Sequence, residues 1–174
     1  AAKDIAVDDM KGWAQRIRDG FGANVTNAGT GGAAFSNCRL SREKATVWHQ
    51  IFRQIHRFEG EYDYILLEGG GNDAAVGAPV GEMSDSFDPE TFDLSTYAGG
   101  FEMLLHNVVK KFGDTAAIGY MSVYKMPLAP RFADTAPYFV MGEKICKKWG
   151  IEYLDLYNTF ELDTEKYTWN GKEG

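Results

Sequence analysis

The sequence predicts an α/β domain of three layers, in which helices cover both faces of a parallel sheet. Segments with helical periodicity alternate along the chain with short runs rich in apolar and aromatic residues, an order typical of parallel sheets. One of these runs, Ile65-Leu66-Leu67, is apolar without interruption, as expected of a strand buried on both faces. The chain has 174 residues, of which 44% are hydrophobic, so we expect residues 1–174 to form a single domain with a substantial core.

The first part of the chain contains two predicted helices and two predicted strands. A helix is expected over residues 9–20, and a strand over 23–27 follows it. A second helix is expected to begin at Ser41 and to reach Phe58, because its apolar residues recur at helical spacing. A β-rich run over 62–68 then predicts a strand of the length usual for a buried one.

The second part continues the same alternation after a long polar insertion. Segment 74–93 is rich in Gly, Pro, Asp and Ser and predicts a loop, of a length that is usually functional or mobile. A helix is expected over 95–113, and another ends at Trp149. Strands are expected over 116–123 and 151–156, which completes four strands that alternate with helices.

The composition excludes two classes of partner. The formal net charge is -7, from 25 acidic and 18 basic side chains, whereas a nucleic-acid surface needs clustered Lys and Arg to displace counterions. No apolar run approaches the roughly 20 residues that span a bilayer, and no segment has the pattern of a secretory signal. We therefore expect neither a nucleic-acid partner nor a membrane span.

The sequence predicts no metal site and no cofactor. The two cysteines, Cys38 and Cys146, lie far apart and form no C-x-x-C pair of the kind that binds zinc. Two thiols, at least one of them buried, are the favoured interpretation, and a single disulfide is the alternative. The acidic cluster in segment 85–93 lacks the spacing of an EF-hand loop, which favours a solvated loop over a calcium site.

Two glycine-rich segments carry the candidate chemistry. Asn27-Ala28-Gly29-Thr30-Gly31-Gly32 follows one predicted strand, and Gly69-Gly70-Gly71-Asn72-Asp73 follows the next. Ligands of open parallel sheets bind beyond the carboxyl ends of the strands, and glycines there present bare backbone N–H groups. Such neutral donors can hold a phosphate or stabilise an oxyanion. Neither segment continues into the lysine of a phosphate-binding loop, which favours the oxyanion; the remaining alternative is that both are tight turns.

These two segments resemble blocks II and III of the SGNH (GDSL-type) hydrolases, and the spacing between them is similar as well. Four further segments resemble bacterial members of that family: 77–81, 95–99, 124–127 and 151–156. The resemblance implies a flavodoxin-like sheet and an esterase or lipase-like activity on ester bonds. It also implies two oxyanion-hole donors, which are the backbone N–H of Gly32 and the side-chain amide of Asn72.

The nucleophile and the base that the resemblance implies are absent from these 174 residues. The family places its serine in a Gly-Asp-Ser motif and its histidine in an Asp-x-x-His motif, and the chain contains neither. Its histidines fall within predicted helices, where solvated positions are the favoured interpretation, and none of its loop serines follows the family pattern. The histidines are His49, His56 and His106, and the serines considered are Ser36, Ser84 and Ser122.

Two explanations for this absence lead to two functions. If the domain is incomplete at both ends, the intact protein is a serine ester hydrolase acting on a small acyl ester or an acetylated carbohydrate. If the motifs are truly missing, the chain is an inactive module of the same fold that binds a glycan or a protein partner. Incompleteness is favoured, because loss of an inner strand would expose unpaired backbone groups. The resemblance favours a secreted or cell-surface bacterial protein, and the sequence does not predict the oligomeric state.

Overall fold

The computed structural model describes residues 12–38, 46–122 and 134–159 of the chain. Two units can be distinguished, one that includes the residues up to Gly29 and one that begins at Thr30. The described helix of the first unit, α1, spans Trp13–Phe21 and ends at Gly22, whose φ of 64° is the left-handed conformation that favours glycine. The helix ends one residue later than the predicted helix over 9–20, and the predicted start at residue 9 lies outside the described residues.

The second unit contains a parallel sheet in the order β1-β2-β3. Its strands are β1 (Tyr64–Glu68), β2 (Ala117–Met121) and β3 (Glu152–Leu154). Both pairings are parallel, with Ile65 opposite Ile118 and Tyr120 opposite Tyr153. Each strand lies inside a predicted range, so the predicted α/β fold with a parallel sheet is confirmed.

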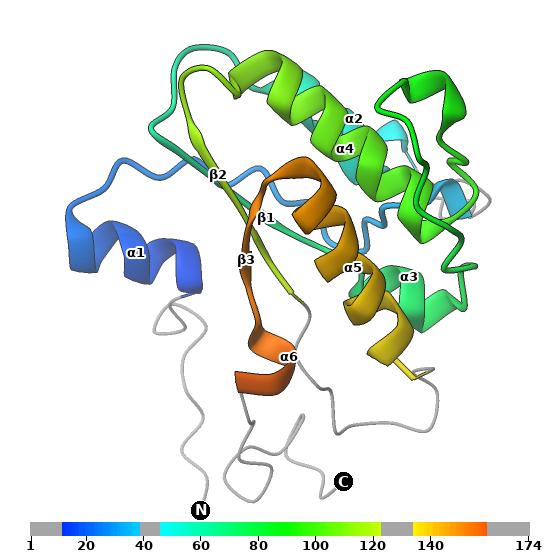
Figure 1. Ribbon diagram of the computed structural model, residues 1–174. Coiled ribbons are helices and arrows are strands. Elements are labelled where there is room, and N and C mark those ends of the chain that lie inside the picture. Colours follow the sequence, from blue (N-terminus) through cyan, green and yellow to red (C-terminus); the bar gives the residue numbers. More distant parts are fainter. Residues whose placement is uncertain (1–11, 39–45, 123–133, 160–174) are drawn as a thin grey trace, which may run out of the picture. The chain divides into compact units, whose positions relative to one another are not determined.

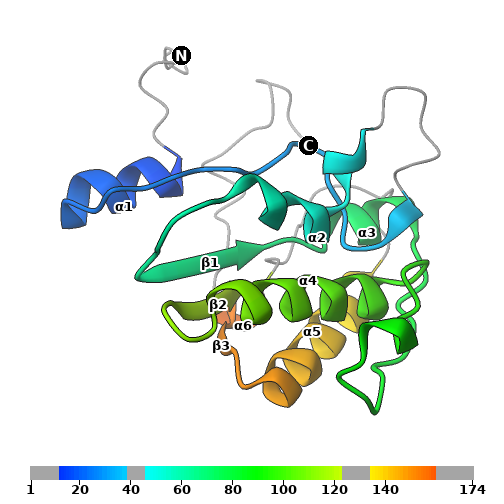
Figure 2. The same cartoon turned by 90° about the horizontal axis from the view of Figure 1, so that it is seen from above.

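Helices α4 (Tyr97–Phe112) and α5 (Ala136–Trp149) pack on one face of this sheet. Figures 1 and 2 show the two helices side by side, with α2 (Ile51–Gln54) against the other flank of α4. α4 begins at Thr96, whose hydroxyl accepts a hydrogen bond from the Gly99 N–H at 3.1 Å, a typical helix cap. The remaining short elements are η3 (Val47–His49), η4 (Ile55–Arg57), α3 (Gly71–Val76), η5 (Pro89–Thr91) and α6 (Leu156–Thr159).

The core lies between the sheet and these helices. Side chains of α4 and α5 meet the inward face of the strands, where Ile65, Leu67 and Tyr120 point toward the helices. Phe35 joins this core from outside the regular elements, stacked on the Phe101 ring at a centroid distance of 4.5 Å. Other core members are Phe52, Ile55, Tyr97, Leu104, Leu105, Val108, Phe112, Tyr138, Ile145 and Cys146.

The strand predicted over 23–27 is absent, which corrects that prediction. These residues have irregular structure, and the side chain of Asn27 accepts a hydrogen bond from the Gly29 N–H at 3.0 Å in a local turn. A strand exists only when a neighbour completes its backbone hydrogen bonds. Among the described residues, no strand pairs with this segment, so its apolar residues alone do not produce one.

The helix predicted up to Phe58 is divided into three short pieces, η3, α2 and η4. The break lies at Gln50, which is extended and forms an isolated parallel bridge with Ala34. The Ala34 N–H donates to the His49 carbonyl and the Ala34 carbonyl accepts from the Ile51 N–H, both at 2.9 Å. These tertiary bonds replace helical ones, and the predicted start at Ser41 lies outside the described residues.

The polar segment 74–93 is fastened to the helices along much of its length. It begins within α3 and contains η5. The buried Glu102 carboxylate of α4 accepts from the Ser84 N–H at 2.8 Å and forms an ion pair with Lys148 of α5. The Lys148 ammonium also donates to the carbonyls of Ser84 and Ser86, each at 2.7 Å. The segment is therefore an ordered part of the unit.

Candidate functional site

The first glycine-rich segment ends in a tight turn at Gly31 and Gly32. The Ala33 N–H donates to the Thr30 carbonyl at 3.1 Å, and Gly32 has a φ of 79°. That left-handed conformation favours glycine. A Cβ placed on Gly32 would meet no atom within 4 Å, so the backbone conformation, rather than the packing of the protein, requires glycine there.

The chain enters the core directly after this turn. Ala33, Ala34, Phe35 and Ser36 are all buried, and we call these four residues the 33–36 segment. The backbone of Phe35 approaches α4 so closely that a Cβ on Gly100 would lie 2.1 Å from the Phe35 carbonyl oxygen. The turn at Gly31 and Gly32 is therefore followed at once by a segment that is packed in the core.

The second glycine-rich segment connects the carboxyl end of β1 to α3. Gly70, with a φ of 100°, precedes the helix as its N-cap residue. A Cβ on Gly69 would lie 2.8 Å from the ring of Phe35 and 2.6 Å from Ile51, and one on Gly70 would lie 2.9 Å from the ring of Tyr97. These glycines allow the end of β1 to approach the 33–36 segment, which brings the start of α3 beside it.

Asn72 reaches the first segment from this helix. Its Nδ2 atom donates a hydrogen bond to the Ala33 carbonyl at 2.8 Å, from a half-buried side chain. Ala33 directly follows Gly32, so this bond ties Asn72 to the residue after the predicted backbone donor. The action of Gly32 and Asn72 on one shared substrate oxygen stays a prediction.

Asp73, the next residue of α3, is a site residue that the sequence analysis did not assign. Its fully buried carboxylate accepts three hydrogen bonds: from the Phe35 N–H at 2.9 Å, from the Ser36 N–H at 2.9 Å and from the Ser36 hydroxyl at 2.6 Å. Burial raises the pKa of the Asp73 carboxyl, and the hydrogen bonds from Ser36 and Phe35 oppose this shift. The only sequence signal for Asp73 was its place directly after Asn72 in the glycine-rich segment.

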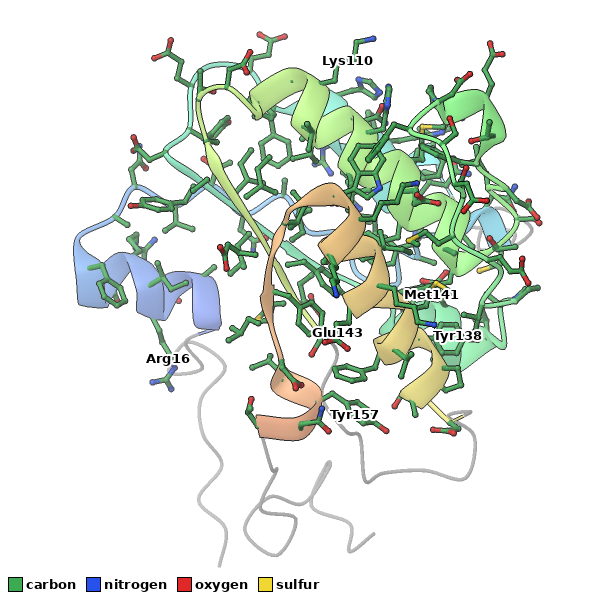
Figure 3. All side chains as sticks on the ribbon, in the orientation of Figure 1. Arg16, Lys110, Tyr138, Met141, Glu143 and Tyr157 are labelled. Atoms are coloured by element: carbon green, nitrogen blue, oxygen red, sulfur yellow. The ribbon has the colours of Figure 1, made fainter. Side chains whose placement is uncertain are left out.

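The far end of α3 is held by α5. Tyr138 of α5 (Figure 3) donates a hydrogen bond from its hydroxyl to the Ala78 carbonyl at 2.5 Å. The Tyr138 ring also meets that of Tyr97 edge-on, at a centroid distance of 5.3 Å. The short helix that carries Asn72 is therefore anchored at both ends.

The sequence predicts solvated helix positions for the three histidines, and the structure shows this for His56, whereas His49 and His106 are half-buried. His49 accepts a hydrogen bond from the Thr46 N–H at 3.0 Å as part of a capping box. His106 on α4 faces the rings of Phe92 and Trp149, and His56 is exposed. None of the three forms a hydrogen bond with a serine among those the structure records.

The serines and cysteines likewise serve packing. The Ser122 hydroxyl accepts from the Leu156 N–H at 2.9 Å, and the Ser84 hydroxyl lies 2.8 Å from that of Thr91. Cys38 and Cys146 form no disulfide, and Cys146 is buried, which confirms the favoured interpretation. In the described part of the chain no three His, Cys, Asp or Glu side chains come together as metal ligands. Nor does it contain a helix long and apolar enough to cross a membrane.

The parallel sheet and its helices form an α/β fold similar to that of solved GDSL-like lipases. A candidate GDSL-like lipase from Bacteroides uniformis is 25% identical, over 76% of this chain and 56% of that one, with a TM-score of 0.54. A protein from Lactobacillus plantarum is 20% identical over 76% and 59% of the two chains, with a TM-score of 0.56. A candidate GDSL-like lipase from Bacteroides ovatus is 19% identical over 76% and 58%, with a TM-score of 0.55.

The chain spans less than two thirds of the length of each of these structures. No family model and no curated protein matches it. The similarities therefore establish the fold.

Proposed function

We propose that this chain is part of a serine ester hydrolase in which Gly32 and Asn72 supply the oxyanion hole. The observation that carries the proposal is the 2.8 Å hydrogen bond from Asn72 Nδ2 to the carbonyl of Ala33, which fixes the amide beside the residue that follows Gly32. The amide nitrogen carries two N–H groups, and this bond uses one of them. Preorganised neutral donors near one point stabilise the negative charge that develops on an ester carbonyl oxygen during acyl transfer. The fold shared with GDSL-like lipases supports the same chemistry.

In this proposal the serine nucleophile and the Asp and His that activate it belong to parts of the protein outside the 174 residues. The serine would attack the ester carbonyl, the histidine would take its proton, and the two donors would hold the resulting oxyanion. The resemblance to SGNH hydrolases favours a small acyl ester or an acetylated carbohydrate as substrate. It also favours a secreted or cell-surface location in a bacterium.

The sheet supports the idea that further polypeptide completes the domain. On the face opposite α4 and α5, Tyr64 is 80% exposed, Leu66 39% and Leu154 52%. Leu66, Gly119 and Leu154 line a shallow, open hollow on this face. Large apolar side chains gathered on one face commonly mark a surface that another element covers, and over 40% of each matching solved structure lies outside the matched part.

The test is Asn72→Ala in the intact protein, assayed with p-nitrophenyl acetate. We expect kcat to fall by about 10²-fold with KM little changed, because an oxyanion-hole donor acts mainly in the transition state. Asn107→Ala is the matched control. Asn107 also donates its side-chain amide to a backbone carbonyl, that of Phe52 at 3.1 Å, but it lies on α4 away from Gly32.

Full activity in Asn72→Ala would contradict the assignment of the donor. Equal losses in the Asn72 and Asn107 variants would show that the effect comes from lost stability. An intact wild-type protein without any activity on acyl esters would contradict the enzyme and favour a binding module of the same fold.

A further inference from the structure

Two consecutive residues of α3 form hydrogen bonds with the 33–36 segment, and one of them donates whereas the other accepts. Asn72 donates its amide to the Ala33 carbonyl, whereas Asp73 accepts from the backbone N–H groups of Phe35 and Ser36 and from the Ser36 hydroxyl. These four protein groups belong to three residues, Ala33, Phe35 and Ser36, of one short stretch of chain. The turn at Gly32 lies immediately before that stretch.

The acceptor geometry at Asp73 requires a carboxylate. One oxygen, Oδ2, accepts from the Phe35 N–H, and the other, Oδ1, accepts from both donors of Ser36. No carboxamide reproduces this arrangement, because its nitrogen would face a buried donor that then has no acceptor. The segment is buried at every residue, so water cannot replace the lost acceptor.

We propose that Asp73 is a positioning residue of the oxyanion hole, which holds the Gly32 turn at the distance from Asn72 that catalysis requires. This inference rests on the proposed function. In this proposal Asp73 does not touch the substrate and acts only through the 33–36 segment. An oxyanion hole depends on donors that are already in place before charge develops, and a displacement of about 1 Å can cost roughly 10²-fold in rate.

The first experiment measures the kinetics of Asp73→Asn in the intact protein with p-nitrophenyl acetate. We expect kcat to fall by roughly 10- to 100-fold while KM changes little, because the misplaced donors serve the transition state. Ser36→Ala should cause a smaller loss, since it removes only the hydroxyl and leaves both backbone donors on Asp73.

Glu102→Gln provides the matched control. Glu102 is as buried as Asp73 and also accepts a backbone N–H, that of Ser84, but it holds the 74–93 segment rather than the Gly32 turn. Each variant is assayed at a temperature at which it is folded. Glu102→Gln should lower the melting temperature and leave kcat at the wild-type value.

A double-mutant cycle separates positioning from general destabilisation. If Asp73 acts by holding the Gly32 turn at the right distance from Asn72, adding Asp73→Asn to Asn72→Ala should lower kcat by a smaller factor than Asp73→Asn alone, because one of the two donors that must be aligned is already lost. A purely structural role for Asp73 would instead multiply the two losses. That result, or wild-type kcat in Asp73→Asn alone, would overturn the inference.

Hydrogen exchange gives a readout that needs no activity. In Asp73→Asn the amides of Phe35 and Ser36 should exchange at least about 10-fold faster than in the wild type, while that of Leu105 in α4 follows global stability alone. Unchanged exchange at Phe35 and Ser36 would overturn the positioning of the segment. Wild-type activity in Asn72→Ala, by contrast, would overturn the proposed function and leave the exchange result to decide the role of Asp73 in holding the turn.

Discussion

Single side chains at the start of α3 decide how the two glycine-rich segments meet. Asn72 and Asp73 differ only by an amide against a carboxylate, yet one donates to the 33–36 segment and the other accepts from it. An exchange of the two residues would place donors against donors and acceptors against acceptors. The order Asn-Asp is therefore set by hydrogen-bond polarity as well as by the chemistry proposed for Asn72.

The two thiols should differ sharply in reactivity. Cys146 is fully buried on α5, and burial raises the pKa of its thiol to about 12, so almost no reactive thiolate is present at pH 8. We expect iodoacetamide at pH 8 to leave Cys146 unmodified in the folded protein and to modify it fully in denaturant. Peptide mass spectrometry distinguishes it from half-buried Cys38. Labelling of Cys146 at the same rate in the folded and denatured protein would contradict its burial.

At the scale of elements, close backbone contacts bring the loops to the helices. The first turn of α4 contains Gly99 and Gly100, and a Cβ at either position would lie 2.1 Å from a backbone carbonyl oxygen, of Asp93 and of Phe35 respectively. Two glycines in a first helical turn lower helix propensity. Here they let the 33–36 segment and the end of the 74–93 segment pack directly on the helix.

We expect Gly100→Ala to destabilise the protein by about 1–3 kcal/mol, because the added methyl group meets a backbone oxygen that cannot move aside alone. Gly119→Ala in β2 is the matched control, since its Cβ would have its nearest neighbour at 3.7 Å, an ordinary contact. Chemical denaturation of both variants measures the difference. A Gly100 variant as stable as the Gly119 variant would show that the loop does not approach α4 so closely.

At the scale of the whole unit, the two faces of the sheet differ in what covers them. Ile65 and Leu67 point into the core beneath α4 and α5, whereas Tyr64 and Leu66, their neighbours in β1, are exposed. A strand that is apolar on both faces is typical of sheets with helices on both sides. The apolar residues on the exposed face fit the proposal that further polypeptide covers them in the intact protein.

Substitutions on the two faces should therefore differ in how much they lower the free energy of unfolding. In the 174-residue chain, replacing Leu66 and Leu154 together by Ser should change the free energy of unfolding by no more than about 0.5 kcal/mol per site and reduce the binding of a hydrophobic dye. Leu67→Ser, on the covered face, should cost about 2 kcal/mol or more. Thermal melts and dye fluorescence test this; equal destabilisation by both changes would show that both faces are packed.

The sequence by itself determined the class of fold and the position of the candidate site. Strands over 64–68, 117–121 and 152–154 follow from short apolar runs, and α4 and α5 follow from helical periodicity. Asn72 was identified because its glycine-rich segment follows a predicted buried strand and resembles block III of the SGNH hydrolases, which implies the donor role. These features depend on residues close together in the chain, so a linear pattern contains them.

Only the tertiary structure decided the features that depend on distant partners. Residues 23–27 form no strand because, among the described residues, none completes their backbone hydrogen bonds. The helix expected through Gln50 is broken because Ala34 pairs with it. Asp73 gains its role from Phe35 and Ser36, 38 and 37 residues away. Hydrogen-bond partners separated this far in sequence leave no periodic signal, so burial and polarity at these positions become visible only once the chain has folded.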